Sequence, residues 1–144
     1  MDKKQPVAKY NPKIEKRPSH LDVYSDEKKI FWSFSLFDSD IKFPKSGKPS
    51  RTFCEIAKAI KACEQRTWAD IDSNRGRDHS IETEKIEKFA RERLVEINLD
   101  DFDILWSLHF GGLGRLWGIR TKSLMQLLWL DEQHEICPSH MKHT

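Results

Sequence analysis

The chain has 144 residues, of which 38% are hydrophobic and 33% are charged, and its net charge is +2. That length can bury one sizeable core but not two, and the composition excludes a disordered chain. The first residues form no apolar leader, and no apolar run reaches the roughly 18 residues of a membrane span. We therefore expect one cytoplasmic domain with no membrane partner.

A basic segment precedes the expected domain. Residues 1–20 contain six Lys or Arg, two acidic residues and three prolines. This predicts a largely extended arm over residues 1–29, which either solubilises the chain or contacts an anionic partner. A single domain is expected over residues 30–131 and a tail over residues 132–144. Three cysteines, an odd number, argue against a disulfide framework.

The first regular element predicted is a strand over residues 30–37, because apolar side chains occupy every second position from Ile30 to Leu36. A helix is expected from residue 52 to about residue 64. Thr52 and Glu55 form a capping-box pattern at its start, and apolar residues then recur at helical spacing.

Two further helical segments are predicted. The pattern from Thr67 to Asp70 favours a short turn that buries Trp68, followed by an exposed polar loop over residues 72–79. A longer helix is expected from an N-cap at Ser80 to about Ile97, because apolar residues form one stripe along it.

The last third of the chain predicts a three-strand meander. Residues 102–110 alternate between apolar and polar, the glycines of residues 111–114 allow a tight turn, and residues 115–120 return antiparallel. Residues 124–130 are apolar on both faces, which is typical of a central strand. The predicted fold is α+β, in the order β-α-α-β-β-β, with an antiparallel C-terminal meander and two helices packed on the sheet.

This element order, over about residues 30–131, resembles the RelE/ParE superfamily of bacterial toxins, which are small ribonucleases or gyrase poisons. The members that cut RNA place basic and aromatic residues on the concave sheet face and in the last strands, without a fixed catalytic triad. The resemblance therefore implies RNA as a partner and an antitoxin-like protein as a possible second partner.

RNA cleavage without a metal needs a base for the ribose 2′-hydroxyl, a cation for the crowded phosphorane and an acid for the leaving oxygen. The candidate catalytic residues are His109 and His134 as acid–base groups, with Arg115 and Arg120 holding phosphate. The two arginines are separated by an odd number of residues and so point to opposite faces. At most one of them can join His109.

Four other residues are candidates for contacting nucleic acid: Lys122 in the last turn, Trp117 as a stacking ring, and Arg77 and His79 near an expected helix N-terminus. Each candidate also has a structural explanation. Arginines often cap sheet edges, strand histidines often make structural hydrogen bonds, tryptophans are usually core residues, and a polar loop needs no ligand.

No metal or cofactor is predicted. His134, Cys137, His140 and His143 lie close together in the sequence but fit no common zinc spacing, and a terminal tail offers no residues to orient them. The two functions that remain are a toxin-like, metal-independent endoribonuclease or RNA-binding domain, and a non-enzymatic module of a mobile element that binds protein or nucleic acid.

Overall fold

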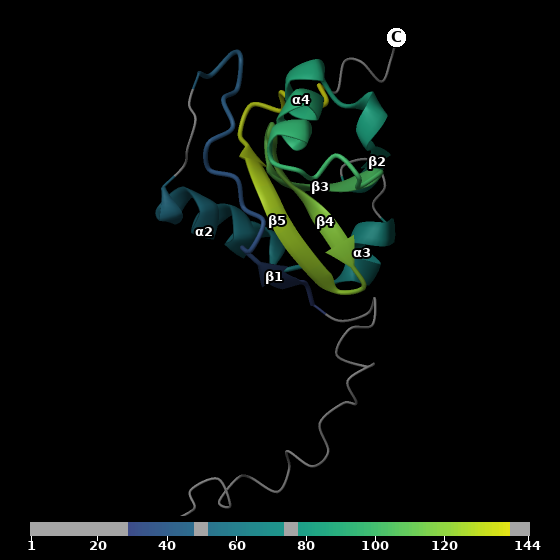
Figure 1. The fold of residues 1–144 in the computed structure, drawn as a ribbon. Coiled ribbons are helices and arrows are strands. Elements are labelled where there is room, and N and C mark those ends of the chain that lie inside the picture. The colour runs from purple at the N-terminus through teal and green to yellow at the C-terminus, as the bar shows by residue number, and fades with distance from the viewer. Residues whose placement is uncertain (1–28, 48–51, 74–77, 139–144) are drawn as a thin grey trace, which may run out of the picture.

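A computed structural model describes residues 29–47, 52–73 and 78–138 of the chain (Figure 1). Its centre is a five-stranded mixed sheet with the strand order β1-β5-β4-β3-β2. The strands are β1 (Phe31–Ser33), β2 (His79–Glu82), β3 (Ile104–Gly111), β4 (Gly114–Thr121) and β5 (Leu124–Asp131). β1 runs parallel to β5, and the other neighbours are antiparallel. The predicted α+β fold with its C-terminal meander is confirmed.

β5 is an interior strand covered on both faces, as its sequence predicts. It lies between β1 and β4, and most of its side chains are buried. A bulge opposite Gly118 interrupts its alternation, so that the consecutive residues Leu128 and Trp129 both belong to the same core cluster. At Gly118 an added Cβ would lie 2.4 Å from the backbone oxygen of Gln126, so only glycine fits the close approach of the two strands.

The first strand is shorter than predicted. β1 ends at Ser33, and the N–H of Phe37 donates to the carbonyl of Phe34, which turns the chain away from the sheet. Downstream, the chain returns to β5, where the N–H of Asp38 donates to the carbonyl of Leu128. The alternating pattern therefore continues past the end of the strand because Leu36 and Phe37 pack against the two cores from a loop.

Both helices before β2 agree with their capping patterns. In α2 (Phe53–Cys63), Thr52 and Glu55 make both bonds of the capping box. In α3 (Trp68–Ser73), the N–H of Thr67 donates to Asp70 and the N–H of Asp70 donates back to the Thr67 hydroxyl.

The prediction of a helix starting at Ser80 is wrong. Residues 79–82 form the edge strand β2, whose Ile81 pairs with Leu105, and a short 3-10 helix η3 (Thr83–Lys85) precedes α4 (Lys88–Glu96). Pairing with β3 outweighs the local capping signal. α4 ends in a Schellman motif: Asn98 is left-handed, with φ 62°, and the N–H of Leu99 donates to the carbonyl of Leu94.

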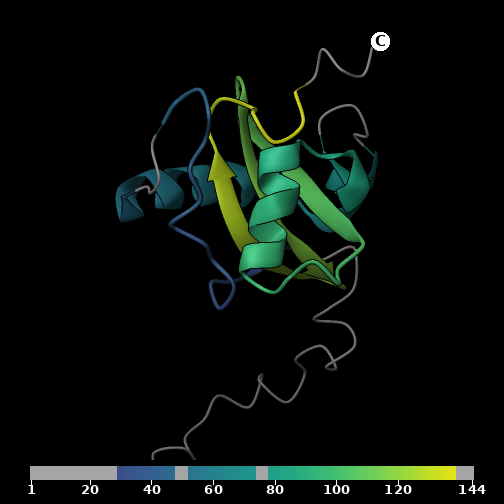
Figure 2. The same ribbon diagram turned by 45° about the horizontal axis from the view of Figure 1, so that its top comes forward.

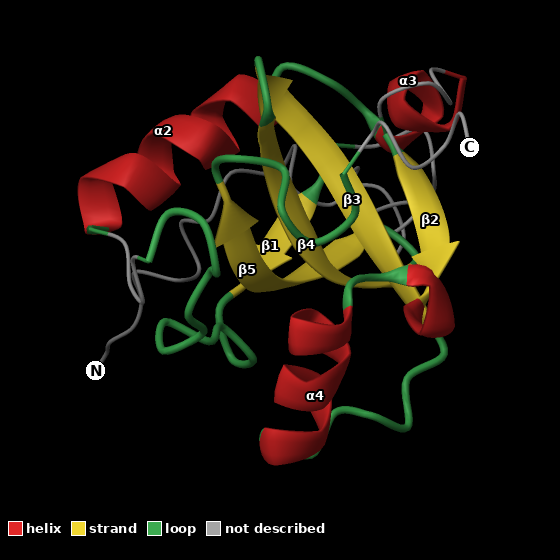
Figure 3. Ribbon diagram, turned by 90° about the horizontal axis from the view of Figure 1, so that it is seen from above, coloured by secondary structure: helices red, strands yellow, loops and turns green. Residues whose placement is uncertain are grey.

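Helices cover both faces of the sheet. α2 and α3 lie on one face and α4 on the other, as Figures 2 and 3 show from two directions. The α2/α3 face encloses a core that includes Trp68, Leu108 and Met125. The α4 face encloses a second core that includes Leu94, Trp117 and Trp129. Within the described ranges, no helix combines the length and apolar character that a membrane crossing requires.

Candidate functional site

The strand register decides which arginine lies beside His109. His109 of β3 is directly opposite Arg115 of β4, and Arg115 is opposite Asp131 of β5. Partners in register project from the same face of a sheet, so these three side chains form one row on the α4 face. Arg120, five positions after Arg115 on β4, projects from the other face.

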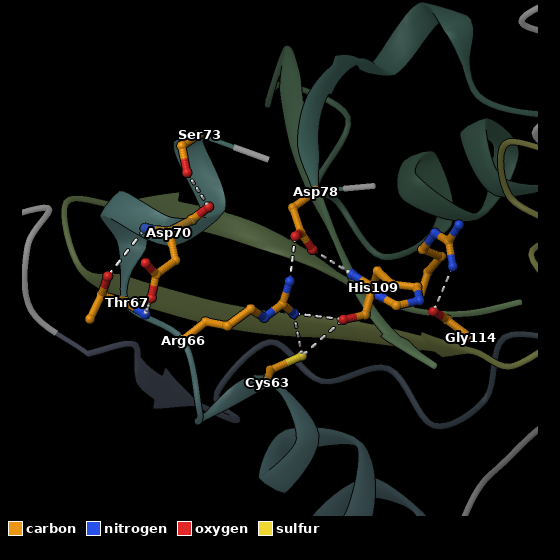
Figure 4. A network of polar contacts seen from close by, with 9 residues as sticks. Cys63, Arg66, Thr67, Asp70, Ser73, Asp78, His109 and Gly114 are labelled. Atoms are coloured by element: carbon orange, nitrogen blue, oxygen red, sulfur yellow. Dashed lines mark hydrogen bonds and ion pairs between the residues drawn. The ribbon is translucent and has the colours of Figure 1, made fainter. Parts of the chain in front are cut away.

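The backbone of His109 is held from the side of β2 (Figure 4). Its N–H donates to Oδ1 of Asp78 at 2.7 Å, and its carbonyl accepts from Nη2 of Arg66 at 2.6 Å. Nη1 of Arg66 also binds Oδ2 of Asp78, which makes an ion pair between the two side chains. Because both main-chain groups of His109 bond away from β4, His109 and Arg115 form a non-hydrogen-bonded pair, in which side chains stand closest.

Cys63 of α2 completes the contacts around this backbone. Its sulfur lies 3.6 Å from the carbonyl oxygen of His109 and accepts from Nη2 of Arg66 at 3.4 Å. Burial raises the pKa of the thiol to about 11, although Arg66 opposes that rise. Cys63 is therefore a neutral donor and is not a nucleophile near neutral pH.

Arg115 lies over the β3–β4 turn. Its Nη1 donates to the carbonyls of Gly114 at 2.9 Å and Gly112 at 3.3 Å, which holds the guanidinium at the end of the sheet. His109 and Arg115 are both half-buried, so the pair reaches the surface while its backbone is fixed. A cation and an imidazole side by side can hold an anion and exchange a proton with it.

Asp131 is the third member of the row and is fully buried beside Arg115. Its carboxylate accepts from the N–H groups of Glu135 and Ile136 and from the indole of Trp117. Burial raises the pKa of Asp131 in spite of these bonds. The bonds fold residues 132–138 back over this end of the sheet, where Ile136 and Cys137 join the core.

His134 lies in that folded segment, three residues after Asp131. Its side chain is buried and its backbone is left-handed, with φ 57°. The structure therefore brings His134 to the same end of the sheet as Arg115, but as a covered residue of a turn.

His79 is the fourth candidate at this end. It pairs with Ser107, the position two before His109 on β3, so His79 and His109 are diagonal neighbours on one face. Nδ1 of His79 lies 3.2 Å from the carbonyl oxygen of Ser80. The buried hydroxyl of Ser107, which lies between His79 and His109, has no hydrogen-bond partner in the structure.

The remaining candidates lie elsewhere. Arg120 binds Asp72 at 3.0 Å and stacks on Trp68, 3.9 Å from the ring centroid, and on Trp106. Lys122 is in the β4–β5 turn, at the opposite end of β4 from Arg115. Trp117 has no exposed surface, so it offers no ring face to a base. Arg77 falls outside the described residues.

The sequence reasoning missed Arg66 and Asp78. Asp78 was expected in an exposed loop, but it is 1% exposed, because its carboxylate is enclosed by Arg66 and the β3 backbone. No local pattern marks either residue, since their contacts join segments far apart in the chain. In the described ranges, no group of three His, Cys, Asp or Glu is placed to hold a metal ion. His140 and His143 lie outside those ranges.

Comparison with protein-family models, with curated proteins and with solved structures finds no match for this chain. Any assignment of function therefore rests on the geometry of the site.

Proposed function

We propose that the chain binds RNA at the end of the sheet formed by His109 and Arg115, and cleaves it there. The observation that carries the proposal is the direct cross-strand pairing of His109 with Arg115, at half-exposed positions with a fixed backbone. The resemblance to RelE/ParE toxins supports it only through the C-terminal meander and the helices before it, because the structure has an additional strand, β2, between α3 and α4.

The proposed reaction uses the RNA's own 2′-hydroxyl. His109 accepts the proton of that hydroxyl, the O2′–P bond forms and the P–O5′ bond breaks, leaving a 2′,3′-cyclic phosphate and a 5′-oxyanion. The oxyanion takes a proton from water to become the 5′-hydroxyl, and the protonated His109 gives its proton back to the solvent. Arg115 stabilises the negative charge on the phosphorane. His79, the diagonal neighbour of His109, is suited to contact the next phosphate. Arg120 has no part in this proposal because Asp72 and two tryptophans hold it on the other face.

The test uses the purified full chain and an end-labelled RNA. His109→Gln should abolish cleavage while RNA binding persists, and Arg115→Ala should weaken both. Lys122→Ala, an exposed residue at the far end of β4, is the control and should keep wild-type activity. The cyclic phosphate end is identified by a phosphatase that removes it only after mild acid has opened the ring, whereas a linear phosphate is removed directly.

Expression in a bacterial host gives a second readout, because an active toxin arrests growth and an antitoxin-like partner would relieve the arrest. If the wild type binds RNA without cleaving it, the proposal of an enzyme is wrong, and the chain is a non-enzymatic RNA-binding module. If the wild type neither binds nor cuts RNA, the proposal is wrong, and the alternative of a protein-binding module takes its place.

A further inference from the structure

β3 is irregular directly after His109. His109 pairs with Arg115, but the next pair is Gly111 with Gly114, so β3 has one residue more than β4 at this point. The extra residue is Phe110, whose ring lies against Gly114 where an added Cβ would be 2.4 Å away. A bulge of this kind leaves the extra residue unpaired and bends the strand directly beside His109.

A slip in register would matter here more than elsewhere. Successive residues of a strand point to opposite faces, so a shift of one residue would turn His109 away from Arg115. The other neighbour, β2, gives no backbone bond to His109. Its last backbone pairing on this side is His79 with Ser107, and β2 does not extend to the level of His109.

Two side chains bond to the backbone of His109 where β2 does not reach. Asp78 accepts the N–H of His109, and Arg66 donates to its carbonyl, the two bonds that a longer β2 would make. The ion pair between them fixes the acceptor relative to the donor. The Asp78 side chain has no exposed surface and that of Arg66 is 22% exposed, so water competes little for these groups.

We propose that Arg66 and Asp78 are positioning residues for His109, and that their ion pair holds its backbone in place beside the bulge. The consequence for catalysis rests on the proposed function. The structural part of the proposal does not rest on that function, because it concerns only how the backbone of His109 is held on the α4 face of the sheet.

The first experiment needs no substitution. In the wild-type chain, amide hydrogen exchange followed by NMR should show His109 protected to the same degree as Ser107, which bonds to β2. An Hα–Hα nuclear Overhauser effect should join His109 and Arg115, since a non-hydrogen-bonded pair places these atoms close together. An unprotected His109 amide or a missing Hα–Hα contact would overturn the proposal.

The second experiment compares two ion pairs of the same kind. Arg66→Lys keeps the charge but loses the fork that reaches both Asp78 and the His109 carbonyl. We expect its His109 amide to exchange roughly tenfold faster and the contact with Arg115 to weaken. Asp78→Asn, which keeps an acceptor oxygen, should show the same changes to a smaller degree. Arg120→Lys, which alters the Asp72 pair on the other face, is the matched control and should leave both signals unchanged. Wild-type signals in Arg66→Lys and Asp78→Asn would refute the positioning role.

The catalytic consequence is measured separately. Arg66→Lys should lower kcat for RNA cleavage about tenfold with little change in KM, whereas Arg120→Lys should change neither at a comparable loss of Tm. Equal kcat losses in the two variants would mean that the Arg66 pair acts only through stability. If the wild type shows no cleavage, the proposed function fails, and the NMR measurements still decide the positioning role.

Discussion

Arg93 of α4 binds the carboxylate of Asp38 through two hydrogen bonds, from Nε at 2.8 Å and from Nη2 at 2.7 Å. The same carboxylate accepts the indole N–H of Trp129 in β5, at 2.9 Å. These bonds of Asp38 connect the loop after β1 with helix α4 and with the interior strand β5. Burial of Asp38 opposes its ionisation, but the bonds from Arg93 and Trp129 outweigh burial, and the pKa of Asp38 is lowered.

Asp38→Asn should therefore destabilise the fold by roughly 2 kcal/mol at pH 7, since it removes the buried carboxylate that Arg93 and Trp129 bind and leaves Arg93 with its exposed partner Glu96. Because the folded-state pKa of Asp38 is lowered, its carboxylate stabilises the fold above the unperturbed pKa of about 3.9, and that contribution is lost as the pH falls further. Urea unfolding at pH 7 and pH 3 measures the difference from wild type, which should shrink at pH 3. Asp40→Asn, an exposed neighbour, is the control. An equal deficit at both pH values would contradict the assignment.

Gly118→Ala should lower the free energy of unfolding by about 1–3 kcal/mol, because the new methyl would meet the backbone of Gln126 at the bulge. Gly112→Ala is a useful comparison. Gly112 has φ 50° but open space around it, so its substitution costs only the backbone strain of about 1 kcal/mol. Denaturant titration of both variants tests the order, and a smaller loss at Gly118 would contradict the close strand approach.

Arg120→Lys should lower stability by about 1–2 kcal/mol although the charge is kept, because an ammonium cannot bind Asp72 through a fork while stacking on Trp68 and Trp106. Thermal unfolding measures the loss. Lys122→Arg, in the adjacent turn, should remain within about 0.5 kcal/mol of wild type. Unchanged stability in Arg120→Lys would show that the stacking contributes nothing.

The cysteines should differ sharply in reactivity. Cys54 is exposed, whereas Cys63 is fully buried with its pKa raised to about 11. Iodoacetamide at pH 8 should therefore label Cys54 in the native chain and reach Cys63 only after unfolding, as peptide mass spectrometry would show. Labelling of both at similar rates would mean that the contacts of Cys63 with Arg66 and His109 open readily.

The meander and α2 were predictable because their signals are local. Alternation marks β3, a run that is apolar on both faces marks β5, glycines mark the turn between β3 and β4, and Thr52 with Glu55 marks the start of a helix. Residues 79–82 were not predictable in this way. Ser80 carries a good capping signal, but pairing of Ile81 with Leu105 fixes the segment as a strand.

The candidate site was predictable only in its residue types. The odd separation of Arg115 and Arg120 limits the choice to one arginine, but register selects between them, and register depends on bulges that no sequence pattern marks. The bonds of Arg66 and Asp78 to His109 could not be predicted from the sequence, since each joins residues that only the folded structure brings together.

The parallel pairing of β1 with β5 has a consequence for synthesis on the ribosome. Phe31 is one of the first residues of the domain to be made, and its partner Leu124 is one of the last. Because synthesis proceeds from the N-terminus, the apolar segment around Trp32 must wait without its neighbour while α2, α3 and most of the sheet emerge. Completion of this sheet is therefore a late, long-range event, and the waiting segment is where a chaperone would find the nascent chain exposed.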